Sequence, residues 1–196
     1  MPNWCANSLK IKPLTEEAKK TFSKIKAELE KGQECRLFNT IIPMPNELMG
    51  TVCGSVEEDK RAAHEAQMQA NIEKYGYPTW YEFANNKWGT KWDVSEPQYM
   101  KNKDGSVTIW FDTAWSPPIA FYNFLFDEGW DVTAKYYEPG VGFIGEYDNS
   151  IDDCWEYSYD DEETIKAIPE ELLEWSGLLE DYNNWKEDNE EIDDAE

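Results

Sequence analysis

The spacing of apolar residues changes several times along the chain, and the order of these changes constrains the fold most. Residues 3–11 alternate apolar and polar side chains, which predicts a strand. Thr15, Glu16 and Glu17 are typical of a helix start, and apolar residues then recur at spacings of four and three. The first part of the chain is therefore predicted to form a strand and an amphipathic helix that ends at Gly32.

A second group of patterns follows after a long intervening segment. Residues 92–100 and 106–113 predict the arms of a hairpin, because the connection at 102–105 is rich in turn residues. Ser116 followed by two prolines is typical of a helix start, and residues 130–136 alternate as a strand. The resulting order is strand, helix, strand, strand, helix, strand. We therefore expect an α+β fold, a ferredoxin-like antiparallel sheet with helices on one face.

The same patterns predict which side chains are buried. Trp4 and Trp110 fall on the faces of their strands opposite the apolar positions. The predicted core positions are Cys5, Leu9 and Ile11 in the first strand, Ala18, Phe22, Ile25 and Leu29 in the first helix, Val107, Ile109 and Phe111 in the hairpin, and Ile119, Tyr122, Leu125 and Phe126 in the second helix.

A helical insertion is expected at about 33–91, between the first helix and the second strand. Residues 37–49 contain two prolines and predict a loop. Capping-box spacing at 55–58 predicts a polar helix that ends near Tyr75, and residues 80–86 predict a short helix.

Nearly all of the net charge of −23 belongs to the last 70 residues. The chain up to Phe126 has 16 acidic and 15 basic residues, whereas the chain from Asp127 onward has 25 acidic and three basic residues. Such a surface repels phosphate backbones and anionic membranes and attracts basic proteins. The charge argues against direct nucleic-acid binding and against a membrane partner, and it favours a basic or nucleic-acid-binding protein as the partner.

The acidic part is expected to fold rather than to remain disordered. We expect a ferredoxin-like domain at 1–148 and an acidic hairpin and helical extension at 149–196 that packs on it. Residues 143–147 and 154–159 predict the hairpin, and residues 187–196 are expected to fray. Apolar residues recur at helical spacing in the extension, and Gly177 divides them into two helices. These residues are Ile168, Leu172, Trp175, Leu179 and Tyr182.

Acidic side chains of the extension are the candidate partner-binding residues, because acids at fixed positions can imitate a nucleic-acid backbone. A second candidate is an aromatic surface of Trp4, Trp110 and Trp115, since RNA-binding sheets stack bases on aromatic side chains. We nevertheless expect the extension or the hairpin to pack over Trp4 and Trp110. The acidic candidates are Asp148, Asp152, Asp153, Glu156, Asp160, Asp161, Glu162, Glu163, Glu170, Glu171, Glu174, Glu180 and Asp181.

The motifs typical of catalysis or cofactor binding are incomplete here. A GxGxxG run at 140–145 precedes acidic turn-forming residues rather than a helix, so it predicts a turn and not a dinucleotide site. His64, the single histidine, is expected to face solvent on a polar helix, and Cys5 is expected to be a small core residue. Acids around Asp148 lack the ligand order of a calcium loop. We expect no catalytic residue, no cofactor and no metal ligand.

The location of the protein follows from the same kind of argument. The four cysteines lack the spacing of a disulfide framework or a zinc knuckle. Residues 1–30 contain no secretory signal pattern, and no apolar run approaches the ~20 residues of a membrane span. A cytoplasmic location is therefore expected.

Four short runs carry a resemblance to a known family. They are NWCANSL at 3–9, KWGTKWD at 87–93, DTAWSPP at 112–118 and FIGEY at 143–147, and together they are similar to the YubB-like family of phage and plasmid proteins. The resemblance covers residues 1 to about 148. It implies a ferredoxin-like domain, an accessory role in a mobile element, no established catalytic residues and the cytoplasm of a bacterial host.

Charge and resemblance together suggest a non-enzymatic protein that binds a host protein through its acidic surface. Inhibition of a defence factor or of a nucleic-acid-binding factor by nucleic-acid mimicry would suit both features. Two alternatives stay open, a nucleic-acid-binding module that uses the sheet aromatics and an enzyme that uses carboxylates or a carboxylate-bound metal.

Overall fold

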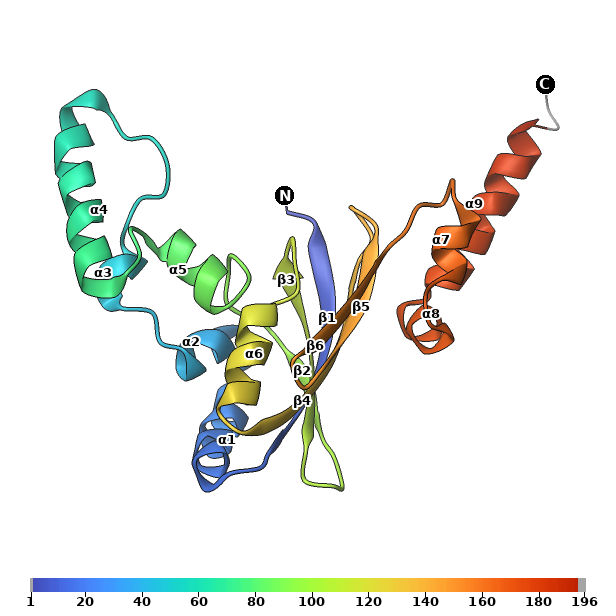
Figure 1. The fold of residues 1–196 in the computed structure, drawn as a ribbon, viewed down its shortest axis with the longest axis horizontal. Helices are drawn as coiled ribbons and strands as arrows, with labels where there is room; N and C mark the ends of the chain where they lie inside the picture. The colour runs from blue at the N-terminus through green and yellow to red at the C-terminus, as the bar shows by residue number, and fades with distance from the viewer. Residues whose placement is uncertain (1, 194–196) are drawn as a thin grey trace.

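A six-stranded antiparallel sheet separates two groups of helices, so the fold is α+β. The computed structural model describes residues 2–193, and its strand order is β2-β3-β1-β4-β5-β6. Figure 1 shows the sheet between α1 and α6 on one side and α7, α8 and α9 on the other. The strands are β1 (Trp4–Pro13), β2 (Gln98–Lys101), β3 (Val107–Ala114), β4 (Trp130–Glu138), β5 (Phe143–Asp148) and β6 (Ile151–Glu156).

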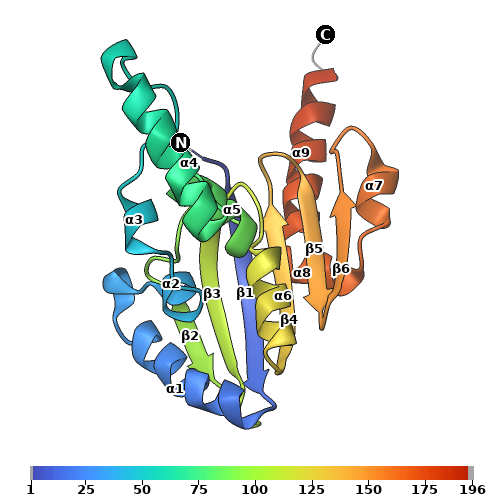
Figure 2. The same ribbon diagram turned by 60° about the vertical axis from the view of Figure 1, so that its left-hand side comes forward.

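The helices follow three segments of the chain. Helices α1 and α6 connect strands, α2 to α5 form the insertion, and α7 to α9 belong to the acidic extension, whose first residues form β6 of the sheet (Figure 2). Their bounds are α1 (Glu16–Leu29), α2 (Leu37–Ile41), α3 (Asn46–Met49), α4 (Arg61–Tyr75), α5 (Trp80–Lys87), α6 (Ile119–Asp127), α7 (Glu162–Lys166), α8 (Glu170–Ser176) and α9 (Leu178–Asp193). No helix among residues 2–193 has both the length and the apolar composition needed to cross a bilayer.

The larger core lies between the sheet and helices α1 and α6. Leu9 of β1 pairs with Ile109 of β3 on one side and with Ala134 of β4 on the other, so adjacent strands contribute to one apolar layer. Thr15 starts α1 as predicted, because its Oγ1 accepts the backbone N–H of Ala18 at 3.1 Å. All of the core positions predicted in the first strand, the first helix and the hairpin are buried.

Helix α6 differs from its prediction at both its start and its buried face. Ser116 is not the N-cap, because its hydroxyl donates to the carbonyl of Gly89 at 3.0 Å and the helix begins only at Ile119. Phe121, rather than Phe126, is buried beside Tyr122 and Leu125, because residues 118, 121, 122 and 125 follow the spacing of one helix face and Phe126 lies outside it.

The insertion contains helices where a loop was predicted. Residues 37–49 form α2 and α3, because Leu37, Phe38 and Leu48 are buried in the larger core. The predicted capping box at 55–58 does not start α4, which follows a 3₁₀ turn at Glu58–Lys60.

Other predicted ends of the insertion helices are confirmed. Helix α4 ends at Tyr75, where Gly76 adopts a φ of 80°. Helix α5 forms where predicted, and the hydroxyl of Thr79 accepts the N–H of Tyr81 at 3.2 Å.

The two hairpins are present, but each has one arm that differs from the prediction. Strand β2 begins at Gln98 rather than near residue 92, directly after Pro97, which has no N–H to donate to a sheet. Strand β6 begins at Ile151 rather than at residue 154, because Asn149 and Ser150 form a two-residue turn with φ values of 45° and 80°.

The acidic extension packs on the sheet face opposite α1 and α6. Tyr137 of β4 and Ile144 of β5 point to this face and form a second, smaller core with the extension. Leu178 is buried and Leu179 is 47% exposed, because the left-handed conformation of Gly177 changes the helix phase between α8 and α9. The other buried members of this core are Ile165, Ile168, Leu172 and Tyr182.

Helix α9 continues to Asp193 through much of the segment where fraying was expected. Residues 194–196 of that segment lie outside the described residues.

Candidate functional site

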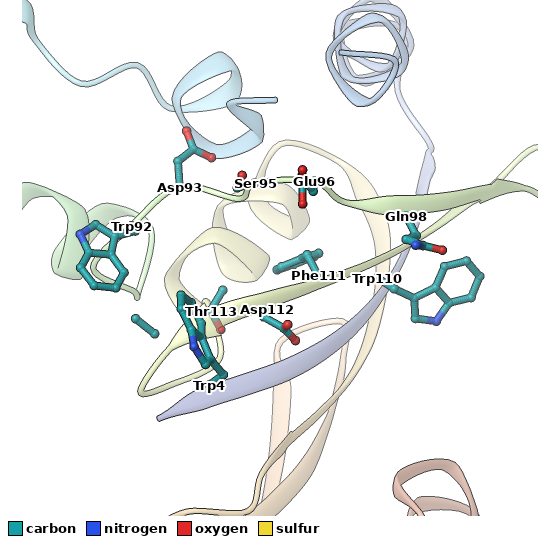
Figure 3. A pocket seen from close by; sticks show the side chains of 11 residues that line it. Trp4, Trp92, Asp93, Ser95, Glu96, Gln98, Trp110, Phe111, Asp112 and Thr113 are labelled. Carbon is teal, nitrogen blue, oxygen red and sulfur yellow. The ribbon is translucent and has the colours of Figure 1, made fainter. Parts of the chain in front are cut away.

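The sheet face opposite α1 and α6, called the open face below, carries a hollow that the extension does not line. Its volume is about 460 Å³, and tryptophan side chains are prominent around it (Figure 3). Trp4 is 49% exposed and Trp110 is 38% exposed, so the expectation that other segments cover both rings is wrong. We call this hollow the tryptophan pocket. Its lining residues are Trp4, Trp92, Asp93, Ser95, Glu96, Gln98, Trp110, Phe111, Asp112, Thr113 and Ala114.

Strand register places a carboxylate between two of the tryptophans. Trp110 and Asp112 are two residues apart in β3, so both point to the open face. On the neighbouring strand Ala6 lies opposite Asp112, and Trp4 lies opposite Ala114. Trp4 is thus a diagonal neighbour of Asp112, at a typical distance of about 7–8 Å. The small side chain of Ala6 leaves space beside the carboxylate.

The third tryptophan comes from the segment between α5 and β2. The ring centroids of Trp92 and Trp4 are 6.1 Å apart, and the planes are inclined by 42°. The Nζ atom of Lys91 lies over the ring of Trp92, 4.6 Å from its centroid, and Lys91 does not line the tryptophan pocket. Trp92 therefore already interacts with a cation outside the tryptophan pocket.

Buried contacts fix the segment that carries Trp92. The indole N–H of Trp88 donates to the carbonyl of Ile42 at 3.0 Å. Gly89 has a φ of 84°, and a Cβ there would lie 3.0 Å from the backbone nitrogens of Ile119 and Ala120. Only glycine combines this conformation with so close an approach to α6.

Two hydrogen bonds connect the same segment to the end of β3. The hydroxyl of Thr90 donates to the carbonyl of Ala114 at 3.2 Å, in addition to the bond from Ser116 to Gly89. The runs at 3–9, 87–93 and 112–118 are distant in sequence, and each supplies residues to the tryptophan pocket.

The electrostatic character of the tryptophan pocket is negative. Its lining residues include Asp93, Glu96 and Asp112 but no lysine or arginine. Asp93 is engaged, because its carboxylate accepts the backbone N–H groups of Phe38 and Asn39 at 2.8 and 2.9 Å. Burial nevertheless raises the pKa of Asp93.

Asp112 differs from Asp93 because its carboxylate has no hydrogen-bond or ion-pair partner among the described residues. Its side chain is exposed on β3, yet desolvation by the surrounding atoms raises the pKa of the carboxyl, and no neighbouring donor offsets that effect. A cation placed beside this carboxylate would stabilise its charged form.

A second hollow of about 390 Å³ continues along the open face toward the extension. Lys10 and Lys135 line it together with Glu146, Asp148 and Glu171. The ion pair between Lys135 of β4 and Glu171 of α8 connects the sheet to the extension. Lysines here are accompanied by carboxylates, whereas the tryptophan pocket contains carboxylates alone.

The predicted acidic residues do not form one continuous surface. Alternation along β6 directs Asp152 toward Tyr136, whose hydroxyl donates to it at 2.7 Å, whereas Asp153 points to the face that carries the extension. Among the residues that the structure describes, no three acidic, histidine or cysteine side chains are grouped closely enough to hold a metal ion.

Some of the predicted acidic residues are engaged within the molecule and others are not. Engaged carboxylates are those of Asp148, Asp152, Asp161, Glu162, Glu163 and Glu171. The remaining candidates are exposed and have no ion-pair partner within residues 2–189. These are Asp153, Glu156, Asp160, Glu170, Glu174, Glu180 and Asp181.

The structure places two of the three tryptophans of the predicted aromatic surface in one hollow and the third outside it. Trp4 and Trp110 line the tryptophan pocket, but Trp115 does not, although its side chain is 52% exposed. The backbone N–H of Trp115 donates to the carbonyl of Asn3, the residue directly before β1. The sequence pattern assigned Trp92 to a hairpin arm. Trp92 also belongs to KWGTKWD at 87–93, one of the short runs that carry the family resemblance, and this was the signal that could have associated it with the site.

Three other motifs have structural surroundings that do not suggest chemistry. The glycines at 140–145 form the β4–β5 turn and the start of β5, as predicted, and no helix follows them. His64 lies on α4 with its Nε2 3.0 Å from the carbonyl oxygen of Val52. Cys5 is fully buried, and burial raises the pKa of its thiol to about 12.

Comparisons with known proteins give limited information. The chain matches no protein-family model, and no curated protein matches it significantly. Among solved structures it is similar to the crystal structure of a protein api92 from Yersinia pseudotuberculosis, described with the family model DUF1281. The identity is 10%, the TM-score is 0.38, and the match covers 81% of this chain and 99% of the other.

Proposed function

We propose that this is a non-enzymatic binding protein that docks a basic partner protein through carboxylates of its extension. The observation that carries this proposal is that the helices of the extension pack on the sheet through a buried apolar core. Its apolar side chains pack against Tyr137 and Ile144 of the sheet, so the seven exposed carboxylates without internal partners project from a folded support. Charges fixed in this way complement a basic surface better than charges on a disordered tail.

The cations of the acidic half do not neutralise these seven carboxylates. Lys135 pairs with Glu171, and Lys166 pairs with both Glu162 and Glu163. The Nζ atom of Lys186 lies 3.7 Å from Oε1 of Glu162. A partner that supplies further cations would relieve repulsion within the extension and bind favourably.

The rest of the proposal concerns fold type and biological setting. We infer that β1–α1–β2–β3–α6–β4 is a ferredoxin-like unit, and the strand order β2-β3-β1-β4 with α1 and α6 on one face supports this. The sequence resemblance to YubB-like proteins supports an accessory protein of a phage or plasmid in the bacterial cytoplasm. Imitation of nucleic acid, and thereby inhibition of a host defence or nucleic-acid-binding factor, is the role we propose for the acidic surface.

A pull-down from bacterial lysate with matched charge variants tests the docking surface. The tail-neutral variant combines Asp153→Asn, Glu156→Gln, Asp160→Asn and Glu174→Gln. Its control removes the same four charges elsewhere, by Glu34→Gln, Glu65→Gln, Glu73→Gln and Asp127→Asn. We expect the wild type and the control to retain the same basic proteins, and the tail-neutral variant to lose them, as measured by quantitative mass spectrometry.

The retained proteins are then tested for nucleic-acid mimicry. The wild-type protein should displace a labelled DNA or RNA duplex from a purified retained protein, and the tail-neutral variant should displace much less. Equal retention by both four-charge variants would show unspecific attraction and contradict the proposed docking surface. Direct binding of nucleic acid by the wild-type protein would favour the sheet-aromatic alternative.

A further inference from the structure

We propose that the tryptophan pocket binds an arginine side chain of a basic protein segment. The guanidinium group would pair with the carboxylate of Asp112, which lies along the sheet between the indole rings of Trp4 and Trp110. This inference rests on the proposed function and deepens it, because it names the chemistry by which the partner is recognised on a surface distinct from the exposed acids of the extension.

Charge complementarity supports a cationic occupant. Asp112 and Glu96 line the tryptophan pocket without an ion-pair partner among the described residues, and no lysine or arginine lines it. The side chain of Asp112 is exposed on β3, and its carboxylate has no hydrogen-bond or ion-pair partner among the described residues, so it is available to a cation from a partner. A guanidinium can supply two parallel N–H donors to such a carboxylate, which adds geometric specificity to the attraction between opposite charges.

The arrangement of the rings favours a planar cation. Trp4 and Trp110 stand on either side of Asp112 along the open face (Figure 3), and Ala6 on the neighbouring strand leaves room between them. Arginine stacks on indole faces through both cation–π and planar contacts, whereas lysine offers a compact, strongly hydrated charge. A volume of about 460 Å³ is sufficient for one long side chain with part of its backbone.

A nucleic-acid base is the competing occupant, because bases also stack on exposed sheet aromatics. Such sites require cations around the rings for the phosphates. The carboxylates of Asp93, Glu96 and Asp112 provide the opposite charge. The acidic extension lies on the same face of the sheet and would repel a nucleic-acid backbone further.

The test uses the whole protein and peptides of alternating glycine and arginine. Binding is measured by calorimetry and by the indole N–H signals of ¹⁵N-labelled protein, which are assigned by single Trp→Phe substitutions. A peptide with citrulline in place of arginine keeps the shape and removes the charge, and a lysine peptide keeps the charge and removes the planar group. We expect the arginine peptide to bind most tightly and to shift the signals of Trp4, Trp92 and Trp110 but not that of buried Trp130.

Single-charge variants distinguish the effect of the tryptophan pocket on peptide binding from the effect of the overall net charge. Asp112→Asn and Asp127→Asn each remove one negative charge, but Asp127 ends α6 in the opposite helix layer. We expect Asp112→Asn to weaken the arginine peptide by roughly tenfold or more, in line with a charge-assisted hydrogen bond, and Asp127→Asn to change it less than twofold. Trp110→Ala should weaken binding about as much as Asp112→Asn, whereas Trp115→Ala, at an exposed ring outside the tryptophan pocket, should not.

The outcomes distinguish this inference from the proposed function. Loss of binding in Asp112→Asn but not in the tail-neutral variant supports the arginine site and counts against docking on the extension. Loss in the tail-neutral variant alone supports docking on the extension and overturns the arginine site. Equal binding of the citrulline peptide, an absence of any peptide binding, or preferential binding of a single-stranded oligouridine that shifts the same signals would each overturn the arginine site.

Discussion

The thiol and amide near the start of β1 show how the surroundings of a single residue decide its chemistry. Asn7 occupies a core position, where its Nδ2 donates to the hydroxyl of Thr113 at 2.9 Å and its Oδ1 accepts the hydroxyl of Tyr122 at 3.0 Å. This network satisfies a polar group that would otherwise be costly to bury. Cys5 precedes Asn7 by two residues and points to the same face of the sheet. Its thiol is fully buried near Tyr122 of α6 rather than exposed in a reactive pocket.

Thiol labelling tests this account at the residue scale. Burial raises the pKa of Cys5 to about 12 and that of Cys35 to about 11, whereas Cys53 and Cys154 are exposed. Because the thiolate is the reactive form, the buried Cys5 thiol should stay protonated and unreactive at pH 8. We expect an aromatic disulfide reagent at pH 8 to modify two thiols rapidly in the native protein and four in denaturant. Rapid labelling of Cys5 in the native state, identified by peptide mapping, would contradict this account.

Helices α8 and α9 show what a sequence pattern can and cannot predict about an element. The stripe predicted an apolar helical side, and three of its residues, Ile168, Leu172 and Tyr182, are buried in the second core. It failed at Leu179, because the pattern was continued through Gly177, where the chain takes a φ of 74° and the helix phase changes. A glycine between two periodic segments predicts a break but does not give the rotation of the second helix.

Leu172 provides a test of the extension as an element. Its side chain is fully buried between α8 and the sheet, so Leu172→Ala should reduce the free energy of unfolding by roughly 2–5 kcal/mol. Leu179→Ala is the matched control, since a 47% exposed leucine on the next helix should change stability by less than about 0.5 kcal/mol. Hydrogen exchange should show that amides of α8 and α9 lose more protection than those of β1. Equal effects of the two substitutions would mean that the second core is not formed as described.

The candidate site was less predictable than the elements for a physical reason. Local alternation placed Trp4 and Trp110 on one face of the sheet, but nothing local shows that Trp92 reaches them from the segment after α5. That segment is positioned by long-range contacts, including the bond from Trp88 to Ile42 and the close approach of Gly89 to α6. The short helices α2 and α3 were missed for the same reason, since the buried side chains of Leu37 and Leu48 stabilise what local propensity does not.

At the scale of the whole molecule, the sheet keeps charge and aromatic surface close together on one side. The helices of the extension lie over the β4–β5 part of the open face (Figures 1 and 2). The tryptophan pocket lies at the β1–β3 part. The second hollow, with Lys10 and Lys135, lies between them. A basic segment bound along β1 could therefore contact the tryptophan pocket at one end and the acids of the extension at the other.

The same concentration of charge should make stability depend on salt. A net charge of −23 destabilises the compact state by self-repulsion, and salt screens charges beyond a Debye length of roughly 10 Å at 0.1 M. We expect the melting temperature of the wild type to rise between about 0.02 M and about 0.5 M sodium chloride. The tail-neutral variant should melt higher at low salt and respond less to added salt. The control with four charges removed elsewhere should respond nearly as the wild type does, because three of those charges lie in the part of the chain where acidic and basic residues balance and the fourth, Asp127, ends α6 on the other side of the sheet. Identical salt responses in the two four-charge variants would show that repulsion is spread over the whole surface and is not concentrated in the extension.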